Sequence, residues 1–499
     1  MDLHPAVRSL VDAVRQAGGR VYMVGGTLRD FLLGKAYKDL DLLVTGLPQN
    51  DLMRLLRRRG RVQRVGQAFG VLKFLPRAWD DPPIDIALPR VETSTGVGHR
   101  DFAVAFDHTL PIEIDLERRD FTINAMALDL LAERLIDPFG GHADLEGCVL
   151  RQVSPLAFPE DPLRMLRGVQ FASRFGLRVE PETWSAMAAH AAAINTVAPE
   201  RIAMELHKLF QAPRPSHGFV LMHEVGLLPH LFPEIDRLAA LPDARSATSQ
   251  EDSPLEASRF GRSMRRLDTV RQGTDLIHRG NLHVLLAALW FDCQPAEDES
   301  ADTQEAPLRW AAGLAQERLE ALRATTIRVR PELVAALIAG SDFAVDDLAQ
   351  AGSLRHFAHR LGCDEAFMVI DLRVAERLAN HAAQGMDDLL DVRRRLRAEI
   401  ERGSPLGLKD LAVNGNDLRQ IGVAPGPGMG RILNDLLHSV LDDPARNTRE
   451  ELLAAAASVL SDQVGLPTGA SPSPQPSPTK GEGVTAPRTQ HRSPPPDEG

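Results

Sequence analysis

The sequence predicts an α+β protein in which an α/β head at the amino terminus is followed by a long all-α region. Short runs rich in aliphatic residues alternate with helical segments over residues 1 to about 150. Beyond Pro155 such runs nearly vanish, and apolar residues recur at three- and four-residue spacing. The second region is also rich in Ala, Leu, Arg and Glu, which are good helix formers.

The head contains four runs that we expect to be strands, at residues 20–26, 39–44, 71–75 and 84–88. A helix is expected between the first two strands, from Gly26 to about Leu33, with Gly34 ending it. The changes in composition predict these domains: a head at 1–150, a helical neck at 151–235, a helical body at 236–402 and a helical tail at 403–465. Residues 466–499 are rich in Pro, Ser and Gly and are expected to be disordered.

Charge and cysteine content exclude several classes of protein. The 499 residues include 57 basic and 68 acidic side chains, a net charge of −11, so nucleic acid would have to bind a local basic surface. The three cysteines lie far apart, which excludes a disulfide scaffold and a thiolate zinc site and favours a reducing compartment such as the cytoplasm. No run approaches the ~20 apolar residues of a membrane span, and the amino terminus lacks a signal peptide's apolar core, so no membrane association is expected.

Local basic surface is available at three places, namely the arginine run of residues 54–64 and the segments 262–271 and 392–397. Such runs are usually only solvated helix faces. The Gly-rich segment 421–432 is as easily an ordinary turn between helices as a phosphate contact. The sequence leaves open which of these segments would contact nucleic acid.

The strongest local pattern is VYMVGGTLRDFLLGKAYKDLDLLVTG at residues 21–46. Gly25 and Gly26, between a strand and a helix, allow backbone N–H groups to approach a phosphate, and Arg29 adds a cationic fork. Asp39 and Asp41, two residues apart on a strand, are expected to share a face and to favour Mg²⁺. Each feature alone is common, and the prediction depends on their occurring together. Asp85 is either a third carboxylate on a neighbouring strand or an exposed strand residue.

Two later segments of the head carry further candidates. In residues 117–130, Arg119 and Asp120 precede an apolar run with helical spacing. One interpretation is that they form surface salt bridges, and the other is that they hold a triphosphate and a ribose hydroxyl. Asp120 could also be the N-cap of the helix. Residues 136–144, IDPFGGHAD, are expected to form a structural turn.

The segment 159–176 places Asp161 and Arg164 three residues apart on a helix, with Arg167 one turn further on. On a helix surface such a pair contributes only ~0.3 kcal/mol. The segment 199–210, PERIAMELHKLF, is expected to support this helix through ion pairs.

Five segments in order, GGTLRD with DLD, RRDFTINA, DPFGGHAD, EDPLRMLR and ERIAMEL, resemble the class II tRNA nucleotidyltransferases, whose head is shared with bacterial poly(A) polymerases. The resemblance covers residues ~20 to 235 densely. It implies a polymerase-β-like nucleotidyltransferase head followed by an elongated helical neck, body and tail. It also implies catalytic, Mg²⁺-binding roles for Asp39 and Asp41, and nucleotide binding by Gly25, Gly26, Arg29, Arg119, Asp120, Asp161, Arg164 and Arg167.

Within this family Asp161 and Arg164 would read the base of CTP or ATP, and the substrate would be the 3′ end of tRNA at its acceptor stem, with no DNA expected. The implied activity is template-independent CCA addition. Poly(A) polymerase is the alternative, although residues 66–74 lack the Gly-Arg-Arg-Phe-Arg-like element typical of those enzymes. Addition of A only or CC only also remains open; the uninterrupted segment 92–116 favours the full reaction over CC addition.

Three further expectations concern what the sequence lacks or retains. A catalytically inactive RNA-binding protein on this scaffold is disfavoured by the retained carboxylates Asp39 and Asp41. Residues 281–295 lack the adjacent His-Asp pair of a phosphohydrolase, so no phosphatase activity is expected there. Gln170 replaces an arginine found in several relatives, and contacts of that arginine are not carried over to it.

Overall fold

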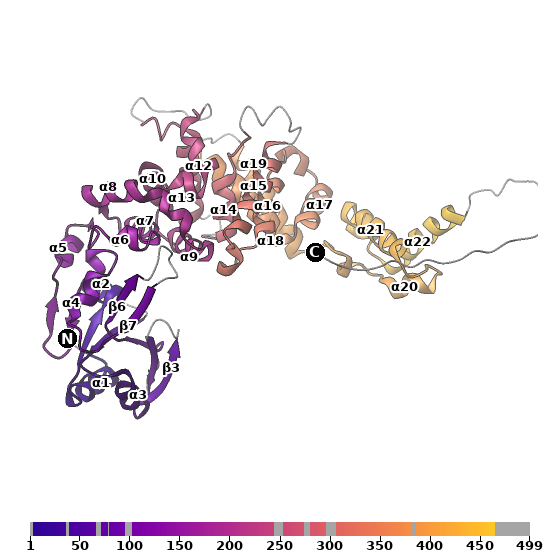
Figure 1. Ribbon diagram of the computed structural model, residues 1–499. Coiled ribbons are helices and arrows are strands. Elements are labelled where there is room, and N and C mark those ends of the chain that lie inside the picture. The colour runs from indigo at the N-terminus through magenta and orange to yellow at the C-terminus, as the bar shows by residue number, and fades with distance from the viewer. Residues whose placement is uncertain are drawn as a thin grey trace, which may run out of the picture. The chain divides into compact units, whose positions relative to one another are not determined.

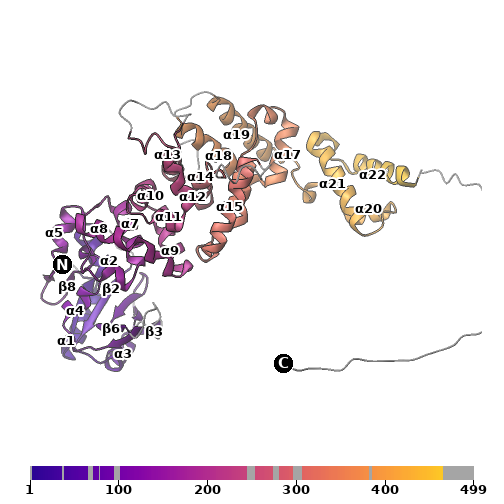
Figure 2. The same ribbon diagram turned by 45° about the horizontal axis from the view of Figure 1, so that its top comes forward.

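The computed structural model describes residues 3–35, 39–65, 71–77, 79–94, 102–243, 253–273, 280–295, 306–380 and 385–464. The chain divides into two compact units, residues 1–406 and 407–499 (Figures 1 and 2). Of the two expected loops, residues 244–252 and 296–305 lie outside the described residues, as does the expected disordered segment 466–499. Within the described part of the chain, no helix is both long and apolar enough to cross a bilayer.

The head is built on a mixed seven-stranded sheet with the order β3-β4-β5-β2-β1-β8-β9. The bounds are β1 Arg20–Val24, β2 Asp41–Thr45, β3 Gly60–Val65, β4 Val71–Pro76, β5 Ile84–Ala87, β8 Ala127–Asp129 and β9 Arg134–Ile136. β2 and β5 pair in parallel, and the other neighbours are antiparallel. A separate hairpin is formed by β6 (Arg90–Ser94) and β7 (Phe102–Phe106).

The four strands expected in the head are present, with ends shifted by one to two residues. The edge strand β3 was not anticipated, because Arg61 and Arg64 leave it with little apolar alternation. A strand at an edge needs no apolar face on its outer side, and charged residues are common there. The sheet therefore has three strands, β3, β8 and β9, beyond the four expected, and the separate hairpin was not expected either.

The two faces of the sheet differ. One face packs its apolar side chains, Leu42, Val44, Leu72, Phe74 and Ile86, against helices α1 (Pro5–Gln16) and α3 (Gln49–Arg57). The opposite face is partly covered by α4 (Ile112–Glu117), which packs on Tyr22, Val24 and Leu43. Because side chains alternate along a strand, Asp41 and Asp85 lie on this second face, where it is open.

Beyond the sheet the first unit is helical apart from one short ladder, β10 (Val149–Leu150) with β11 (Arg178–Val179). Around the neck lie α2 Gly25–Leu32, η1 Thr122–Asn124, α5 Gly141–Glu146, α6 Ala157–Glu160, α7 Leu163–Phe175, α8 Pro181–His190, η2 Ala191–Thr196, α9 Pro199–Phe210, α10 Pro215–Glu224, α11 Leu228–Leu231, α12 Pro233–Arg237 and η3 Leu238–Ala240. Helix α7 packs on α9 and α10, and the close approach of Phe121 to Gly168 joins head to neck: a Cβ at Gly168 would lie 2.7 Å from the Phe121 ring.

The body comprises α13 Arg259–Gln272, α14 Leu282–Trp290, α15 Pro307–Ala321, η4 Ala324–Ile327, α16 Pro331–Gly340, η5 Val345–Leu348, α17 Ala351–Leu361, α18 Cys363–Ala379 and α19 Met386–Glu401. The second unit contains η6 Leu408–Asp410, α20 Gly415–Gln420, α21 Pro427–Asp442, η7 Pro444–Arg446 and α22 Arg449–Val464. It has a small core of its own that includes Leu418, Leu436 and Leu452. Leu408 to Val464 are thus helical apart from their connections, as expected for the tail.

Candidate active site

A glycine turn joins the central strand β1 to helix α2. Gly25 begins the helix with φ +64°, a left-handed conformation that favours glycine. A Cβ at Gly25 would lie 3.0 Å from Arg119 Nη1, and one at Gly26 would lie 3.5 Å from Arg29 Nη2. The glycines therefore let two guanidinium groups approach the backbone where the strand ends. The expected strand–helix order is confirmed, and Gly34 follows the helix with φ +67°.

Asp41 opens strand β2, whereas Asp39 lies before it and is exposed. The expectation that both aspartates share one strand face is therefore wrong, because the strand starts only at Asp41. The two are instead linked through Thr27, a buried residue that the sequence did not single out. Its hydroxyl donates to the Asp39 carbonyl at 2.9 Å and accepts from the Asp41 amide at 2.9 Å. The first turn of α2 thereby fixes the loop that carries the carboxylates.

Asp85 stands beside Asp41 in the sheet. The parallel register of β2 and β5 pairs the two residues, and on the other side β4 places Lys73 opposite Asp85. Lys73 Nζ lies 3.2 Å from Asp85 Oδ1. Burial raises the pKa of Asp41, and the carboxylate of Asp85 and, more weakly, that of Asp39 raise it further. Of the two interpretations of Asp85, the register favours a third carboxylate beside Asp41, and this carboxylate is paired with Lys73.

Clustered carboxylates whose ionisation is unfavourable are typical of a site that binds a cation. Within the described residues, no three acidic, histidine or cysteine side chains form a ready-made metal cluster. A hard divalent cation of the Mg²⁺ type needs no such cluster, because it commonly uses one or two carboxylates together with substrate phosphates. The oxygen donors of Asp39 and Asp41 fit a cation held jointly with a bound polyphosphate.

Arg119 lies beside the glycine turn, fixed by a residue that sequence reasoning missed. Its Nη2 and Nε donate to Asp115 Oδ2 at 3.0 and 3.3 Å, and its Nη1 donates to the Asn124 carbonyl at 3.2 Å. Asp115 is buried and also accepts from Arg118 Nε at 3.2 Å. The spacing of Asp115 and Arg119, four residues on a helix, was the available signal.

The segment after Arg119 is not the helix expected from its spacing. The three-residue turn η1 is followed by β8, which pairs with β1. Strand pairing in the sheet thus overrides the local helical pattern. Asp120 is no helix N-cap: its Oδ1 accepts from the Phe121 amide at 2.8 Å and from Asn124 Nδ2 at 3.1 Å. The turn expected at DPFGG is confirmed, with Asp137 accepting from the Gly141 amide at 2.7 Å.

Arg29 is buried, with 4% of its surface exposed. Its Nη1 donates to Asn124 Oδ1 at 2.8 Å, and its Nε and Nη2 donate to Asp30 Oδ1 at 3.0 and 2.8 Å. The guanidinium also stacks 4.3 Å from the ring centre of Phe175 at the end of α7. Burial lowers the pKa of Arg29 below its usual value. In the structure this arginine joins α2 to η1 and to the neck; phosphate binding by Arg29 stays a prediction.

Arg167 on α7 reaches back to the head. Its Nη2 and Nε lie 2.7 and 2.8 Å from Asp120 Oδ2, and its Nη1 lies 3.6 Å from Glu205 Oε1 on α9. Burial alone would raise the pKa of Asp120, but the charge of Arg167 and the hydrogen bonds hold it below the ordinary value. Burial would likewise lower the pKa of Arg167, and the carboxylates of Asp120 and Glu205 raise it instead.

Arg164 lies on α7, whereas Asp161 precedes that helix in an extended conformation with φ −143°. The expectation that the two share one helix face is therefore wrong, and each has its own partners. Asp161 Oδ2 accepts from Arg201 Nη2 on α9 at 2.8 Å. Arg164 Nη2 donates to the Arg118 carbonyl at 2.7 Å, and its Nη1 lies 3.4 Å from Glu160 Oε2. Both side chains are thus oriented by contacts from outside the pair, and α9 supports α7 as the sequence predicted.

Gln170, where several relatives carry arginine, is buried and faces the interior. Its Nε2 has no hydrogen-bond partner among the described residues. A charged side chain at this position would need a carboxylate partner in the neck core.

Around the glycine turn, a carboxylate row, anchored arginines and the first turn of a helical neck converge on one open sheet face. This arrangement defines the class: a polymerase-β-like nucleotidyltransferase head on a helical body. Residues 21–151 match the profile of the "Poly A polymerase head domain", and residues 176–238 match the "Probable RNA and SrmB- binding site of polymerase A". Residues 371–456 match "tRNA nucleotidyltransferase domain 2 putative". The resemblance to the class II tRNA nucleotidyltransferase and bacterial poly(A) polymerase family is confirmed over these ranges.

Relatives with closer sequences are proteins named "Multifunctional CCA protein". The one from Nitrosomonas europaea is 37% identical over 238 residues, 47% of this chain and 55% of that protein. The one from Thioalkalivibrio sulfidiphilus is 41% identical over 228 residues, 45% of this chain and 53% of that protein. The matched segments thus span about half the length of these relatives.

Solved structures share the fold over nearly the whole chain. The CCA-adding enzyme of Bacillus stearothermophilus, in complex with CTP, aligns with a TM-score of 0.62 and 23% identity over 93% of this chain and 99% of that one. The Thermotoga maritima CCA-adding enzyme complexed with tRNA aligns with a TM-score of 0.55 and 21% identity over 92% and 96% of the two chains. The expected fold class, an α/β head followed by a mostly helical remainder, is confirmed.

Proposed function

We propose that the protein is a template-independent tRNA nucleotidyltransferase that adds C, C and A to tRNA 3′ ends from CTP and ATP. The single observation that carries the proposal is the juxtaposition of the Asp41–Asp85 register pair with the Gly25 turn on the open sheet face. The names of the sequence relatives and the tRNA-, CTP- and ATP-bound structures of the same fold support the substrate class.

Asp39 and Asp41 would hold Mg²⁺. A divalent cation held there would supply Lewis-acid activation of the tRNA 3′-hydroxyl and positive charge beside the leaving pyrophosphate. The backbone N–H groups at Gly25 and Gly26 would bind the triphosphate at the beginning of α2, where the helix dipole also favours an anion. Arg119, fixed by Asp115, would add a preset positive charge beside this turn.

Base selection would rest on the start of α7. Cytosine and adenine each present an exocyclic amine and a ring-nitrogen acceptor, which an aspartate acceptor and an arginine donor can match. In the unliganded arrangement Asp161 contacts Arg201 and Arg164 contacts the Arg118 carbonyl. Asp161 and Arg164 would still have capacity to bind a base, since a carboxylate has four acceptor sites and a guanidinium has five donors. The ion pair of Arg167 and Asp120 would set the distance between this helix and the triphosphate site.

The proposal includes the cytoplasm as the location. It draws on the cysteines, Cys148, Cys293 and Cys363, which are all free thiols, as a reducing compartment keeps them. The proposal includes no phosphohydrolase in the body, where Asp292 is buried against Arg262 and Arg266 rather than beside a histidine.

The second candidate is poly(A) polymerase, favoured by the head-domain match. The segment that distinguishes it is residues 66–74, of which 66–70 lie outside the described residues. Residues 95–101 of the segment 92–116, which bears on CC-only addition, also lie outside them. The products therefore decide. Purified protein is incubated with Mg²⁺ and tRNA lacking its last three nucleotides, with labelled CTP alone, ATP alone, or both.

Full CCA addition requires that CTP alone adds two residues and that both nucleotides together add three. Long products from ATP alone would identify a poly(A) polymerase. A stop after two cytidines in the presence of both nucleotides would identify CC-only addition, and addition only to tRNA already ending in CC would identify A-only addition. No incorporation from any nucleotide, with Mg²⁺ present and tRNA bound, would leave an inactive RNA-binding protein and reject the proposal.

A further inference from the structure

Three arginine clusters were candidates for a nucleic-acid surface, and the structure separates them. In the body segment 262–271, Arg262 and Arg266 are buried with 5% and 0% exposure. Arg262 Nη2 donates to Asp292 Oδ1 at 2.7 Å, and Arg266 also binds Asp292. Arg265 donates to the Ala379 carbonyl at 3.0 Å. Arg262 and Arg266 are therefore core residues and are excluded as an RNA surface. Arg265 and Arg271 are partly exposed and donate to backbone carbonyls.

The second cluster, residues 392–397 on α19, is largely committed to the body's own acceptors. Arg393 Nε donates to the buried Asp371 at 2.9 Å. Arg395 donates to Asp391 at 2.8 Å and to the Leu348 carbonyl at 2.9 Å. Asp391 also accepts from Arg394, so its carboxylate offsets part of the positive charge at this surface.

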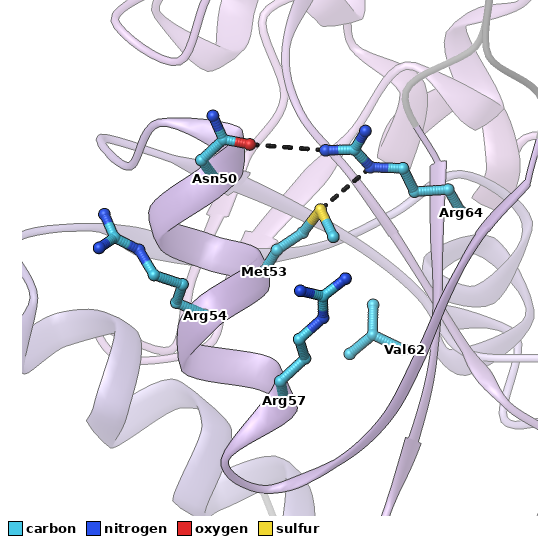
Figure 3. A pocket seen from close by; sticks show the side chains of 6 residues that line it. All are labelled: Asn50, Met53, Arg54, Arg57, Val62 and Arg64. Atoms are coloured by element: carbon cyan, nitrogen blue, oxygen red, sulfur yellow. Dashed lines mark hydrogen bonds between the residues drawn. The ribbon is translucent and has the colours of Figure 1, made fainter.

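The third cluster lies on α3 and β3 of the head and surrounds a cavity of about 430 Å³, lined by Asn50, Met53, Arg54, Arg57, Val62 and Arg64. We call this the arginine pocket. Figure 3 shows the guanidinium groups of Arg57 and Arg64 directed toward the space between helix and strand. Arg64 Nε donates to the Met53 sulfur at 3.1 Å, and its Nη2 lies 3.5 Å from Asn50 Oδ1. These partners carry no charge, so they do not neutralise Arg64.

This cluster retains more unneutralised charge than the second one, where Arg397 is exposed but Arg393 and Arg395 pair with aspartates. Three arginines of this cluster have exposed side chains that form no hydrogen bond or ion pair within the described residues, namely Arg57, Arg58 and Arg61. Only Arg54 has an acidic partner, Asp51. On a chain whose net charge is −11, a group of exposed, unpaired guanidiniums is a local positive surface that attracts anions.

The charge continues around the edge of the sheet. The register places Arg64 opposite Leu72 on the α1 and α3 face, whereas Gln63 lies opposite Lys73, in line with Asp85 and Asp41. Arg61, two residues before Gln63, shares the face of the carboxylate row. Edge strand β3 thus carries arginines on both faces, and its positive surface begins on the carboxylate face and ends in the arginine pocket.

We infer that edge strand β3 and the arginine pocket form a phosphate-binding surface for the backbone of the RNA substrate, outside the reaction centre. The inference rests on the proposed function for the identity of the RNA. Planar guanidiniums with free donors bind phosphate oxygens in a bidentate manner, and an edge lined with them contacts a backbone without reading its sequence. Such contacts would strengthen RNA binding and leave the chemical step unchanged.

A simpler role for charge on an edge strand is to prevent pairing with the edge of another molecule. The two roles make different predictions for the double variant Arg57→Ala/Arg64→Ala, which removes pocket charges but leaves Arg58 and Arg61 at the edge. The matched control is Arg394→Ala, another exposed arginine on a helix, whose partner Asp391 keeps Arg395. Size-exclusion chromatography and thermal unfolding confirm that each variant is folded and does not aggregate.

The experiment measures the dissociation constant of the full chain for labelled tRNA lacking its last three nucleotides, between 50 and 300 mM KCl. For the double variant we expect about tenfold weaker binding at low salt, and a slope of log Kd against log salt that falls by about 1.5 to 2. The control should change neither. In incorporation assays the KM for tRNA should rise by a similar factor, with kcat and the KM for CTP unchanged.

Unchanged tRNA affinity and salt slope in a folded double variant would overturn the inference. Unchanged tRNA affinity together with aggregation of the variant would show that the arginines prevent the sheet edge from pairing with another molecule. Unchanged tRNA affinity with weaker binding of poly-L-glutamate would assign them to an acidic protein partner. The binding measurement needs no turnover, so failure of the wild type to incorporate nucleotides would reject the proposed function without deciding this question.

Discussion

Arg167 Nη2 lies 2.7 Å from Asp120 Oδ2, and the same oxygen accepts from Arg167 Nε at 2.8 Å. This pair joins the first two turns of α7 to the end of the head, where Asp120 is 7% exposed. A buried carboxylate that loses its counter-charge is destabilising, so the pair links the geometry of the candidate base-reading helix to the folding of the head.

The first prediction concerns the stability of this junction. Arg167→Ala leaves Asp120 buried with only the Phe121 amide and Asn124 as partners, and should lower the free energy of unfolding by about 3 kcal/mol. The control Arg201→Ala removes a pair whose side chains are 40% and 27% exposed, and should cost about 0.5 kcal/mol. Urea unfolding measures both. Equal losses would show that burial of Asp120 does not decide the effect.

A second prediction follows from the raised pKa of Asp41. A carboxyl group whose pKa is higher in the folded than in the unfolded state favours folding at low pH, and that contribution is lost as pH rises through the folded pKa. At pH 7 the ionised Asp41 therefore destabilises the metal-free protein. Asp41→Asn should raise the melting temperature in EDTA by about 2 °C at pH 7, and the gain should shrink toward pH 4. A lower melting temperature at pH 7 would contradict this.

Activity should also depend on the ionisation of Asp41, but it should be favoured by high pH rather than low pH. Only ionised Asp41 is expected to bind Mg²⁺, so kcat/KM should fall as pH decreases through the raised pKa, at a higher pH than for an ordinary aspartate. Asp41→Asn should lower nucleotide incorporation by about 1,000-fold or more while tRNA binding persists. Incorporation measured between pH 5 and 8, with tRNA affinity as control, tests this; retention of a tenth of the activity would contradict it.

The third site for a prediction is the buried body cluster. Asp292 accepts from Arg262, and also from Arg266 and Ser263, in a core where all four side chains are nearly inaccessible. Asp292→Ala leaves two buried guanidiniums without their shared carboxylate and should destabilise the protein by about 3–5 kcal/mol. Asp391→Ala, at an exposed pair on α19, should cost less than about 1 kcal/mol. Thermal unfolding of the two variants distinguishes a structural cluster from a surface one.

The sequence predicted features that depend on local order and failed where distant segments decide. The glycine turn and α2 are local and were found, whereas Asp161 was placed on a helix that begins only at Leu163. The edge strand β3 was missed because its arginines conceal alternation, and the helix expected after Asp120 is absent because β8 pairs with β1.

The candidate site shows the same division. Thr27 and Lys73 were missed because each acts on a residue brought close by the fold. Asp115 was missed although its partner Arg119 is only four residues away. The arginines of residues 262–271 are indistinguishable in sequence from a solvated face, although Arg262 and Arg266 are core residues. Charge composition alone does not indicate which guanidiniums the fold neutralises.

Arg29 offers the last prediction, because the sequence and the structure suggest different roles for it. The sequence predicts contact with the triphosphate, whereas the structure shows the guanidinium bonded to Asn124 and Asp30 and stacked on Phe175. Lysine retains a positive charge but loses the planar fork and the stacking. If Arg29 mainly holds α2 against η1 and the neck, Arg29→Lys should destabilise the protein by about 2 kcal/mol even though the positive charge is kept.

Arg119→Lys is the matched control for the phosphate role, since Arg119 also borders the glycine turn but is less deeply buried, with 21% of its side chain exposed. It should raise the KM for CTP by about tenfold and change stability by less than about 1 kcal/mol. Chemical unfolding and CTP titration of both variants decide the matter. If Arg29→Lys instead raised the KM for CTP and left the unfolding midpoint unchanged, the buried contacts of Arg29 would be incidental to its role.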